Sequence, residues 1–276
     1  MKRVLTVQDF SCFGKCSLTI ALPVISALGV ECVAIPSTIL STHTGNLGDV
    51  TAINLEKHID SIILHFRKLN LTFDVIYIGY LGSVELVEIA YRLITSLRSE
   101  STIVLVDPVM GEYGKLYSRL NNEYVQQIKT IVKLADYIVP NMTEATLLTN
   151  HPYLGEQVSR EHLAHLFKLL ADTYDAYPII TGIIDSGDMI GIATVDKEQD
   201  FVHLRITKRL PSHYHGTGDL FASLIAGTLA NGLEILDVLD DCVEFITRVI
   251  LATTVAGTDE RYGLQFEGLL GVLSDW

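Results

Sequence analysis

The sequence predicts a three-layer α/β/α sandwich in which helices cover both faces of a mostly parallel β-sheet. Short apolar runs rich in β-branched residues alternate along the chain with longer segments of helical period, as expected for repeated strand–helix units. Hydrophobic residues make up 49% of the 276 residues and charged residues only 19%, so the chain can bury a large core. Two strand-like runs, 189–195 and 201–207, flank five polar residues and predict an antiparallel hairpin near one edge of the sheet.

The predicted elements follow one another in a regular order. Strands are expected at residues 4–7, 32–35, 75–78, 103–106, 137–139 and 178–181, before the hairpin. Helices are expected at residues 16–28, 50–69, 84–97, 123–134, 144–148 and 162–171, and a buried helix follows a glycine turn at residue 216. Gly29 ends the first helix, and Asp49 is the expected N-cap of the second. Because the chain contains no linker, repeat or low-complexity tract, we expect a single domain, residues 1–276.

The charge of the chain argues against two classes of partner. The sequence has 20 Lys and Arg residues against 33 Asp and Glu residues, a net charge of −13, and its basic pair Lys208-Arg209 is short. We therefore expect neither nucleic acid nor an anionic membrane as a partner. A nucleotide is compatible with this charge, because helix ends and a metal ion can supply positive potential locally.

The cysteines and the N-terminus predict a cytoplasmic protein. Cys12, Cys16, Cys32 and Cys242 lack the spacing of a zinc or redox site, so four reduced thiols are expected. The first residues do not have the layout of a signal peptide, and no apolar run reaches the ~18 residues of a membrane span.

Polar motifs follow six of the predicted strands. In open parallel sheets, ligands bind past the carboxyl ends of the strands, so six such motifs on one rim predict a ligand site. The motifs are Gln8-Asp9, residues 41–45, Gly79-Tyr80, residues 107–111, residues 140–144 and Thr181-Gly182.

The glycine turn opens directly into the buried helix. Gly216 and Gly218, on either side of Thr217, free the backbone for turn conformations and let a ligand approach it closely. The N–H groups at the start of the helix, at the positive end of its dipole, form a site for an anion. Asp219 follows at once. It is either a residue that stabilises the helix start or the base that accepts a hydroxyl proton in phosphoryl transfer.

Two carboxylates at the same rim predict a magnesium site. Asp107 follows the fourth strand, and Glu144 lies four residues after the proline that ends the fifth. Together with Glu112 and Asn141 they can supply hard oxygen ligands for a magnesium–nucleotide complex. The alternative is structural, with Asp107 in a turn and Glu144 at the start of a helix that Asn141 caps.

These motifs resemble those of the ribokinase-like superfamily, and the chain closely resembles the bacterial pyridoxal/pyridoxine/pyridoxamine (vitamin B6) kinases over essentially its whole length. Residues 216–222 (GTGDLFA) match the most specific signature of the superfamily. Residues 106–111 (VDPVMG) and 140–145 (PNMTEA) match two further loops of the family. Residues 41–45 (STHTG) resemble the substrate segment of vitamin B6 kinases, and Tyr80 corresponds to a tyrosine that lines the pyridine pocket.

The resemblance implies an ATP- and Mg²⁺-dependent kinase that phosphorylates the 5′-hydroxymethyl group of a vitamin B6 vitamer, and relatives in the family are commonly homodimers. Asp219 would be the base, and the N–H groups of Gly216, Thr217 and Gly218 would bind the transferring phosphoryl group. The remaining implied roles are Mg²⁺ binding by Asp107 and Glu144, nucleotide phosphate binding by Asn141 and Thr181, and binding of the ring by His43, Thr44 and Tyr80.

Asp9 departs from the family pattern. The familiar vitamin B6 kinases carry a serine there, and that serine touches the substrate. An aspartate can instead accept a hydrogen bond from a protonated pyridine, a phenol or the amine of pyridoxamine. The alternative is that Asp9 points to solvent or bonds a nearby loop.

Two other functions stay open. Hydroxymethylpyrimidine kinases of thiamine synthesis share the fold and the Gly-Thr-Gly-Asp motif, although residues 43–45 favour vitamin B6. A non-catalytic binder of pyridoxal phosphate is the second alternative, and the intact Asp219, Asp107 and Glu144 argue against it.

Overall fold

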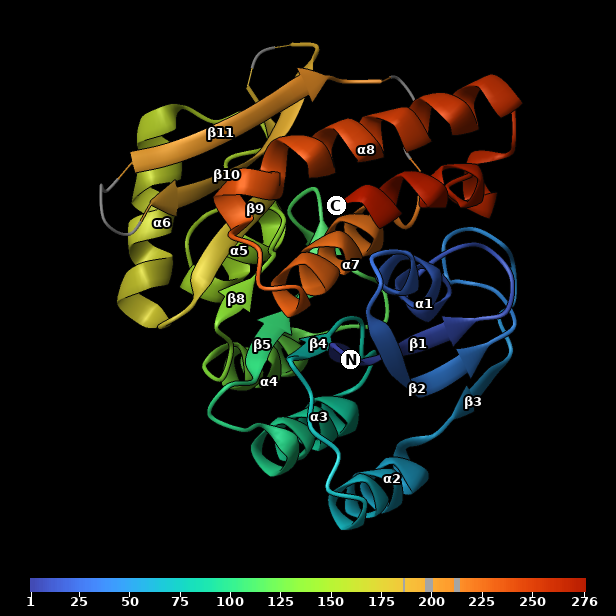
Figure 1. Cartoon of the computed structure of the whole chain (residues 1–276). Coiled ribbons are helices and arrows are strands. Elements are labelled where there is room, and N and C mark those ends of the chain that lie inside the picture. Colours follow the sequence, from blue (N-terminus) through green and yellow to red (C-terminus); the bar gives the residue numbers. More distant parts are fainter. Residues whose placement is uncertain (186, 197–200, 211–213) are drawn as a thin grey trace.

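A nine-stranded β-sheet forms the centre of the protein (Figure 1). The computed structural model describes residues 1–185, 187–196, 201–210 and 214–276. From one edge to the other, the strands are β11 (Phe201–Lys208), β10 (Met189–Asp196), β9 (Tyr177–Ile184), β8 (Tyr137–Ile138), β5 (Ile103–Val106), β4 (Val75–Ile78), β1 (Arg3–Ser11), β2 (Glu31–Leu40) and β3 (Ala52–Asn54). A separate two-stranded sheet pairs β6 (Gly111–Glu112) with β7 (Lys115–Leu116).

The sheet is parallel in its middle and antiparallel at both edges. The pairs β2–β1, β1–β4, β4–β5, β5–β8 and β8–β9 are parallel. Strand β10 runs antiparallel to both β9 and β11, so the predicted hairpin is confirmed at one edge. Strand β3 runs antiparallel to β2 at the other edge.

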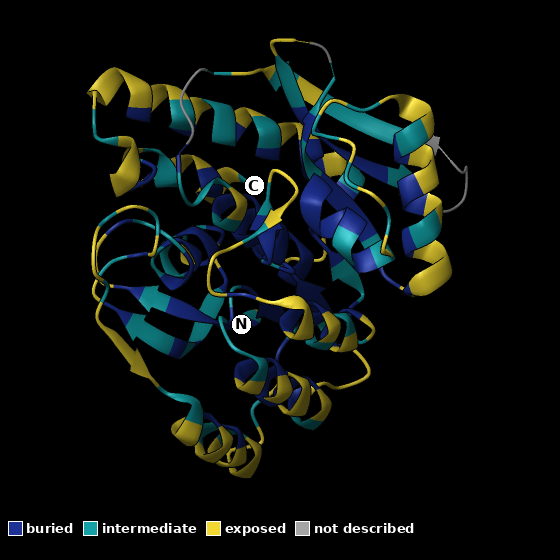
Figure 2. Ribbon diagram, turned by 180° about the vertical axis from the view of Figure 1, so that it is seen from behind, coloured by how far each residue is buried: buried dark blue, intermediate teal, exposed yellow. Residues whose placement is uncertain are grey.

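Helices cover both faces of the sheet, as the sequence predicts (Figure 1). One face packs against α2 (Glu56–Lys68), α3 (Val84–Leu97), α4 (Asn122–Val132), α5 (Met142–Thr149) and α6 (Arg160–Thr173). The other packs against α1 (Leu18–Ala27), α7 (Thr217–Ala230) and α8 (Ile235–Ala256). The 3₁₀ helices η1 (Glu260–Tyr262) and η2 (Glu267–Asp275) follow. Figure 2 shows the buried inner faces of the helices and the exposed outer ones.

Strand β4 shows why the central strands are apolar throughout. All four of its residues are buried, and they alternate between the two cores. Ile76 and Ile78 pack into the core under α2–α6, whereas Val75 and Tyr77 pack into the core under α1, α7 and α8. A strand that is buried on both faces needs an apolar residue at nearly every position.

The helix predicted at residues 50–69 is wrong in its first turn. Residues Ala52–Asn54 form the edge strand β3, and α2 begins only at Glu56 with Leu55, not Asp49, at the N-cap. The reason is tertiary: Thr38, Ile39 and Leu40 of β2 pair with this segment, so main-chain bonding to the sheet replaces the local helical preference.

Strands β1 and β9 are longer than predicted. Strand β1 continues to Ser11 and β9 to Ile184, so Gln8-Asp9 and Thr181-Gly182 lie within strands and not after them. These residues still lie toward the carboxyl ends of their strands.

The C-terminal quarter contains an element that the sequence did not predict. The long helix α8 lies on the outside of α7, and Gly257 ends it in a left-handed conformation (φ 63°). No helix in the described part of the chain is long and apolar enough to cross a membrane. All four cysteines are free thiols, as predicted.

Candidate active site

The polar motifs predicted to share a rim do lie on neighbouring strands. Main-chain hydrogen bonds connect residues at the carboxyl ends of neighbouring parallel strands. The N–H of Gly79 donates to Val7 (3.2 Å) and that of Asp107 to Ile78 (2.8 Å). The N–H of Thr181 donates in the same way to Pro140 (2.9 Å). The strand order therefore brings these motifs together on one rim of the sheet, at the carboxyl ends of the parallel strands.

The start of α7 has the geometry of an anion site. Gly216 is the N-cap with φ 87°, and a Cβ at this position would lie 2.5 Å from the main-chain oxygen of Lys15, so only glycine fits. The first intrahelical bond runs from Leu220 N–H to Gly216 O (2.9 Å). The N–H groups of the residues before Leu220, including Thr217 and Gly218, have no intrahelical acceptor.

Asp219 is held in the first turn of α7. Its side chain is only partly exposed, and burial raises its pKa from 3.8 to about 6. A backbone hydrogen bond from Ser17 lowers this pKa and the negative charge of Asp9 raises it. A carboxyl group with a pKa near 6 is ionised at neutral pH, yet it is more basic than an exposed aspartate, as a general base requires.

Glu144 and Asn141 form a capping box at the start of α5. The Asn141 side-chain oxygen accepts from Glu144 N–H (3.0 Å) and Glu144 Oε2 accepts from Asn141 N–H (2.8 Å), which confirms Asn141 as the helix cap. Glu144 Oε1 accepts from Met110 N–H (3.0 Å). Each oxygen of Glu144 therefore has a main-chain donor, and this carboxyl group ties α5 to the loop after β5.

Asp107 and Glu144 are two buried carboxyl groups that repel one another. Burial raises the pKa of Glu144 to about 8. Burial raises the pKa of Asp107 well above its ordinary value, and the charges of Glu144 and Asp219 raise it further. Such a pair favours either a shared proton or a bound cation at neutral pH.

The carboxyl pair fits Mg²⁺ only if the ion draws its other ligands from elsewhere. Among the described residues, no group of three or more His, Cys, Asp and Glu side chains is arranged to hold a metal ion. Glu112, the fourth expected ligand, lies in β6. Mg²⁺ commonly binds through one or two carboxylates together with water and nucleotide phosphates, so Asp107 with Glu144 behind it fits this ion.

Asn141 and Thr181 lie side by side through an isolated β-bridge. The Asn141 side-chain amide also donates to the main-chain oxygen of Gly111 (2.8 Å), which fixes the start of β6. Both of its polar atoms are therefore already bonded within the protein. The role of these two residues toward a nucleotide stays a prediction.

His43 connects the loop after β2 to the C-terminal segment. Its ring is buried; Nδ1 accepts from Gly45 N–H (3.0 Å), and Nε2 lies 2.6 Å from the main-chain oxygen of Arg261. These partners place the ring proton on Nε2. A Cβ on Gly14, whose φ is 78°, would lie 2.2 Å from the ring. Since both nitrogens bond the main chain, His43 fixes the position of the loop, in which the neighbouring Thr44 is exposed.

Tyr80 lies near Asp9 on the same rim, at the carboxyl ends of the parallel strands. Its ring is half-buried and packs against Gly82, where a Cβ would lie 3.2 Å from the ring. Burial raises the pKa of Tyr80, and the negative charge of Asp9 raises it further. The structure therefore brings together two of the residues predicted to bind substrate.

Asp9 is buried and bonded to two serines, which the sequence did not predict. Its Oδ1 accepts from the Ser17 hydroxyl (2.5 Å) and its Oδ2 from the Ser11 hydroxyl (3.0 Å), and only 4% of Asp9 is exposed. The alternative in which Asp9 points to solvent is therefore wrong. Ser11, two residues away on the same face of a strand, could have been inferred from sequence, whereas Ser17 could not.

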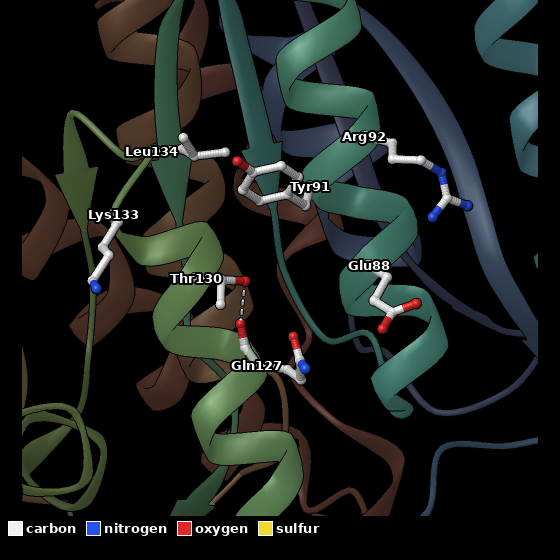
Figure 3. A pocket seen from close by; sticks show the side chains of 7 residues that line it. All are labelled: Glu88, Tyr91, Arg92, Gln127, Thr130, Lys133 and Leu134. Atoms are coloured by element: carbon white, nitrogen blue, oxygen red, sulfur yellow. Dashed lines mark hydrogen bonds between the residues drawn. The ribbon is translucent and has the colours of Figure 1, made fainter.

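A large surface depression lies elsewhere, on the outer side of the α3–α4 layer (Figure 3). Its volume is about 560 Å³, and none of the predicted site residues lines it. The lining residues are Glu88, Tyr91, Arg92, Gln127, Thr130, Lys133 and Leu134.

Comparisons with known proteins agree with the resemblance. Pyridoxal kinase of Arabidopsis thaliana is 29% identical over 231 residues, which cover 82% of this chain and 73% of that protein. The crystal structure of pyridoxal kinase from Lactobacillus plantarum matches with a TM-score of 0.91 and 33% identity, covering 99% of this chain and 96% of that one. A candidate phosphomethylpyrimidine kinase from Bacteroides thetaiotaomicron, in a crystal form with pyridoxal, matches with a TM-score of 0.92 and 32% identity, covering 99% and 95%.

A family model matches most of the chain. It spans residues 21–262, and so includes the loops after β2, β4, β5 and β8 and the glycine turn before α7. The chain belongs to the phosphomethylpyrimidine kinase family.

Proposed function

We propose that the protein is an ATP-dependent kinase that phosphorylates the 5′-hydroxymethyl group of a vitamin B6 vitamer, which is pyridoxal, pyridoxine or pyridoxamine. With pyridoxal as substrate the product is pyridoxal 5′-phosphate. One observation carries the proposal: Asp219 is partly buried in the first turn of α7, directly after the N–H groups of residues 216–218, and its pKa is raised to about 6. A base beside an anion site is what phosphoryl transfer to an alcohol requires.

Asp219 and the N–H groups of the glycine turn have separate tasks in the reaction. Asp219 accepts the hydroxyl proton as the substrate oxygen bonds to the γ-phosphorus of ATP and the bond from that phosphorus to the bridging oxygen of ADP breaks. The N–H groups of Gly216, Thr217 and Gly218 stabilise the charge on the transferring phosphoryl group. The dipole of α7 adds to this stabilisation.

Asp107 and Glu144 would hold Mg²⁺, with Asp107 facing the ion or its water and Glu144 supporting the loop from behind. Mg²⁺ would neutralise charge on the nucleotide phosphates. The observation that supports this role is the burial of two carboxyl groups beside one another. Asn141 and Thr181 would lie along the nucleotide.

On the substrate side, Thr44 and Tyr80 would contact the ring. His43 would act indirectly, because its bonds to Gly45 and Arg261 fix the loop that carries Thr44. Asp9 would border this site from β1.

A hydroxymethylpyrimidine kinase is the second candidate function, and the name of the matching family favours it. Two of the relatives described above are named pyridoxal kinases, and the third binds pyridoxal in its crystal although it is named after the pyrimidine substrate. The names alone do not separate the two substrates, whereas a direct comparison of rates does.

The test is a substrate panel with ATP and Mg²⁺: pyridoxal, pyridoxine, pyridoxamine, hydroxymethylpyrimidine and ribose. Release of ADP and the mass of the phosphorylated product are measured for each. The highest kcat/KM is expected for a B6 vitamer. A higher value for hydroxymethylpyrimidine would favour the second function. Tight binding of pyridoxal phosphate without any phosphorylated product would show a non-catalytic binder.

The proposal also includes a cytoplasmic homodimer. The four free thiols fit a reducing compartment. Light scattering coupled to size exclusion measures the oligomeric state, and a mass of 30.5 kDa would show a monomer.

A further inference from the structure

His215 comes directly before the glycine turn, and its ring packs against the loop after β2. The ring centroid lies 4.8 Å from that of His43, with the two planes tilted by 42°. A Cβ on Gly45 would lie 2.5 Å from Nε2 and 2.6 Å from Cε1 of His215, so the ring rests on the main chain of the loop. Gly45 does not have a positive φ, so the nearness of the ring, and not the backbone conformation, excludes a side chain there.

His43 limits how far the His215 ring can move. His43 is buried, and its own ring is held at both nitrogens, by Gly45 N–H (3.0 Å) and by the main-chain oxygen of Arg261 (2.6 Å). The His215 ring therefore meets a fixed ring and a main chain at the same time. A displacement of the loop presses directly on His215.

The main chain around His215 forms a closed turn. Before it, the hydroxyl of the buried Tyr214 lies 3.2 Å from the hydroxyl of Thr254 on α8, within hydrogen-bond distance. After it, the Thr217 hydroxyl donates to the main-chain oxygen of Tyr214 (2.9 Å), which closes the turn over His215 and Gly216. A force on the His215 ring therefore acts on a short segment that contains the N–H groups of the anion site.

Gly216 has little room to absorb such a force. A Cβ at this position would lie 2.5 Å from the main-chain oxygen of Lys15 and 2.5 Å from Cδ1 of Ile20. The C-terminal segment holds Lys15 in turn, because the Lys15 N–H donates to the main-chain oxygen of Tyr262 (3.3 Å). A displacement of His215 is therefore expected to change the conformation of the turn itself.

We propose that His215 is a positioning residue that couples the vitamer loop, residues 41–50, to the phosphate-binding turn, residues 216–218. A ligand that fixes the loop also fixes the turn through the contact between Gly45 and His215, so that binding at one subsite favours binding at the other. By linkage the effect is equal in both directions. The inference rests on the proposed function, which places a vitamer at Thr44 and the nucleotide phosphates at the glycine turn.

The first experiment is a double-mutant cycle of Gly45→Ala and His215→Ala, in which calorimetry measures the affinity for the ATP analogue AMP-PNP with Mg²⁺. Gly45→Ala puts a Cβ against the His215 ring, and we expect it to weaken nucleotide binding by about fivefold or more, although it lies in the vitamer loop. In the His215→Ala background there is no ring to displace, so the same substitution is expected to change this affinity by less than about twofold.

Two features of the chain make the cycle specific. The new Cβ would also lie 3.0 Å from Cε1 of His43, but this contact is present in both backgrounds and cancels in the comparison. Gly271→Ala is the matched control, because Gly271 is exposed and a Cβ there meets no atom within 4 Å. It should leave the nucleotide affinity unchanged.

A purely structural contact would lower the melting temperature of Gly45→Ala without weakening nucleotide binding by protein that circular dichroism shows to be folded. A nucleotide affinity that Gly45→Ala leaves unchanged, or weakens by the same factor with and without His215, would overturn the proposal.

The second experiment measures the coupling between the two ligands. The dissociation constant of pyridoxine is determined with and without AMP-PNP. In the wild type the nucleotide is expected to tighten pyridoxine binding by about fivefold or more, and in His215→Ala by less than about twofold. The same factor in both proteins would contradict the role of His215.

The inference and the proposed function can fail separately. If the wild type binds AMP-PNP but phosphorylates no vitamer, the proposed function fails, and the double-mutant cycle still decides whether His215 connects the loop to the turn. If the wild type does not bind AMP-PNP, the ¹³Cα chemical shifts of Gly216 and Gly218, which follow their backbone angles, replace the affinity. Gly45→Ala is then expected to change these shifts only where His215 is present. Turnover of a vitamer together with additive effects in the cycle would leave the function intact and overturn the inference.

Discussion

The carboxyl group of Glu144 accepts hydrogen bonds from the N–H groups of Asn141 (2.8 Å) and Met110 (3.0 Å), so it joins the start of α5 to the loop that follows β5. This arrangement gives Glu144 a structural task besides any role toward Mg²⁺. A glutamine in its place has only one acceptor oxygen, so one of the two N–H groups loses its partner.

We expect Glu144→Gln to lower the free energy of unfolding by about 1–3 kcal/mol, the usual cost of a buried donor without an acceptor. It is also expected to raise the Mg²⁺ concentration at half-maximal rate, because it removes a negative charge behind Asp107. Urea unfolding and a magnesium titration of the rate measure the two effects. Glu123→Gln, in the exposed first turn of α4 after the N-cap Asn121, is the matched control and should change neither. A magnesium titration identical to that of wild type would exclude the metal role of Glu144.

Asp219→Asn is expected to lower kcat by ~10²–10⁴, because asparagine cannot accept the hydroxyl proton. The melting temperature and ATP affinity should stay close to wild type. Asp237→Asn removes another first-turn carboxylate, on the exposed start of α8, and should keep wild-type activity. More than about a tenth of wild-type kcat in Asp219→Asn would leave Asp219 as a residue that only stabilises the helix start.

The rate is expected to depend on the protonation of Asp219. Its pKa of about 6 means that kcat falls with decreasing pH below about 6, as the base becomes protonated. The effect on stability has the opposite sign. The folded pKa lies above the ordinary 3.8, so this group stabilises the fold fully below pH 3.8, and that contribution is lost as pH rises through 6. The dependence of kcat on pH and urea unfolding, both measured from pH 4.5 to 8, test the two effects. Below a pH of ~4.5 the other carboxylates of the protein titrate as well, which sets the lower limit. A rate that is flat across pH 6 would contradict the assignment of the base.

His43→Phe keeps a ring of similar shape but removes both nitrogens. The N–H of Gly45 and the main-chain oxygen of Arg261 then lose their partner, so we expect a loss of about 1–3 kcal/mol in the free energy of unfolding. We also expect a higher KM for the vitamer, because the loop that carries Thr44 is less well fixed. His58→Phe, at an exposed position on α2, is the control. An unchanged KM together with reduced stability would show that this loop does not contact the vitamer.

The discrimination between vitamers tests whether Asp9 touches the substrate. Both Asp9 oxygens accept from serine hydroxyls, so we expect Asp9→Asn to lower kcat/KM for pyridoxamine and pyridoxal by the same factor. The ratio of the two specificity constants, measured at one pH, should then equal that of wild type. A ratio that falls threefold to tenfold against pyridoxamine, or about 0.6–1.4 kcal/mol, would instead show a direct charge-assisted bond to the amine.

The sequence by itself determined the elements whose signals are local. The strands at 75–78 and 103–106 and the helix at 84–97 have the predicted bounds, because their apolar periodicity and their ends lie within the segments. The capping role of Asn141 and the glycine turn before Asp219 are local as well, since a cap or turn involves residues three or four apart. The rim on which the motifs gather followed from strand–helix alternation alone.

Only the tertiary structure decided how these residues are used. Strand β3 exists because β2 offers it main-chain partners, and no local pattern in residues 52–54 shows this. His43 bonds Arg261 at a separation of 218 residues, and the Ser17 hydroxyl donates to Asp9 on β1. Contacts of this kind depend on which strands become neighbours and how loops cross above them. Periodicity and capping describe one element at a time, so the bonding of Asp9 to Ser17 appears only when the fold brings distant parts of the chain together.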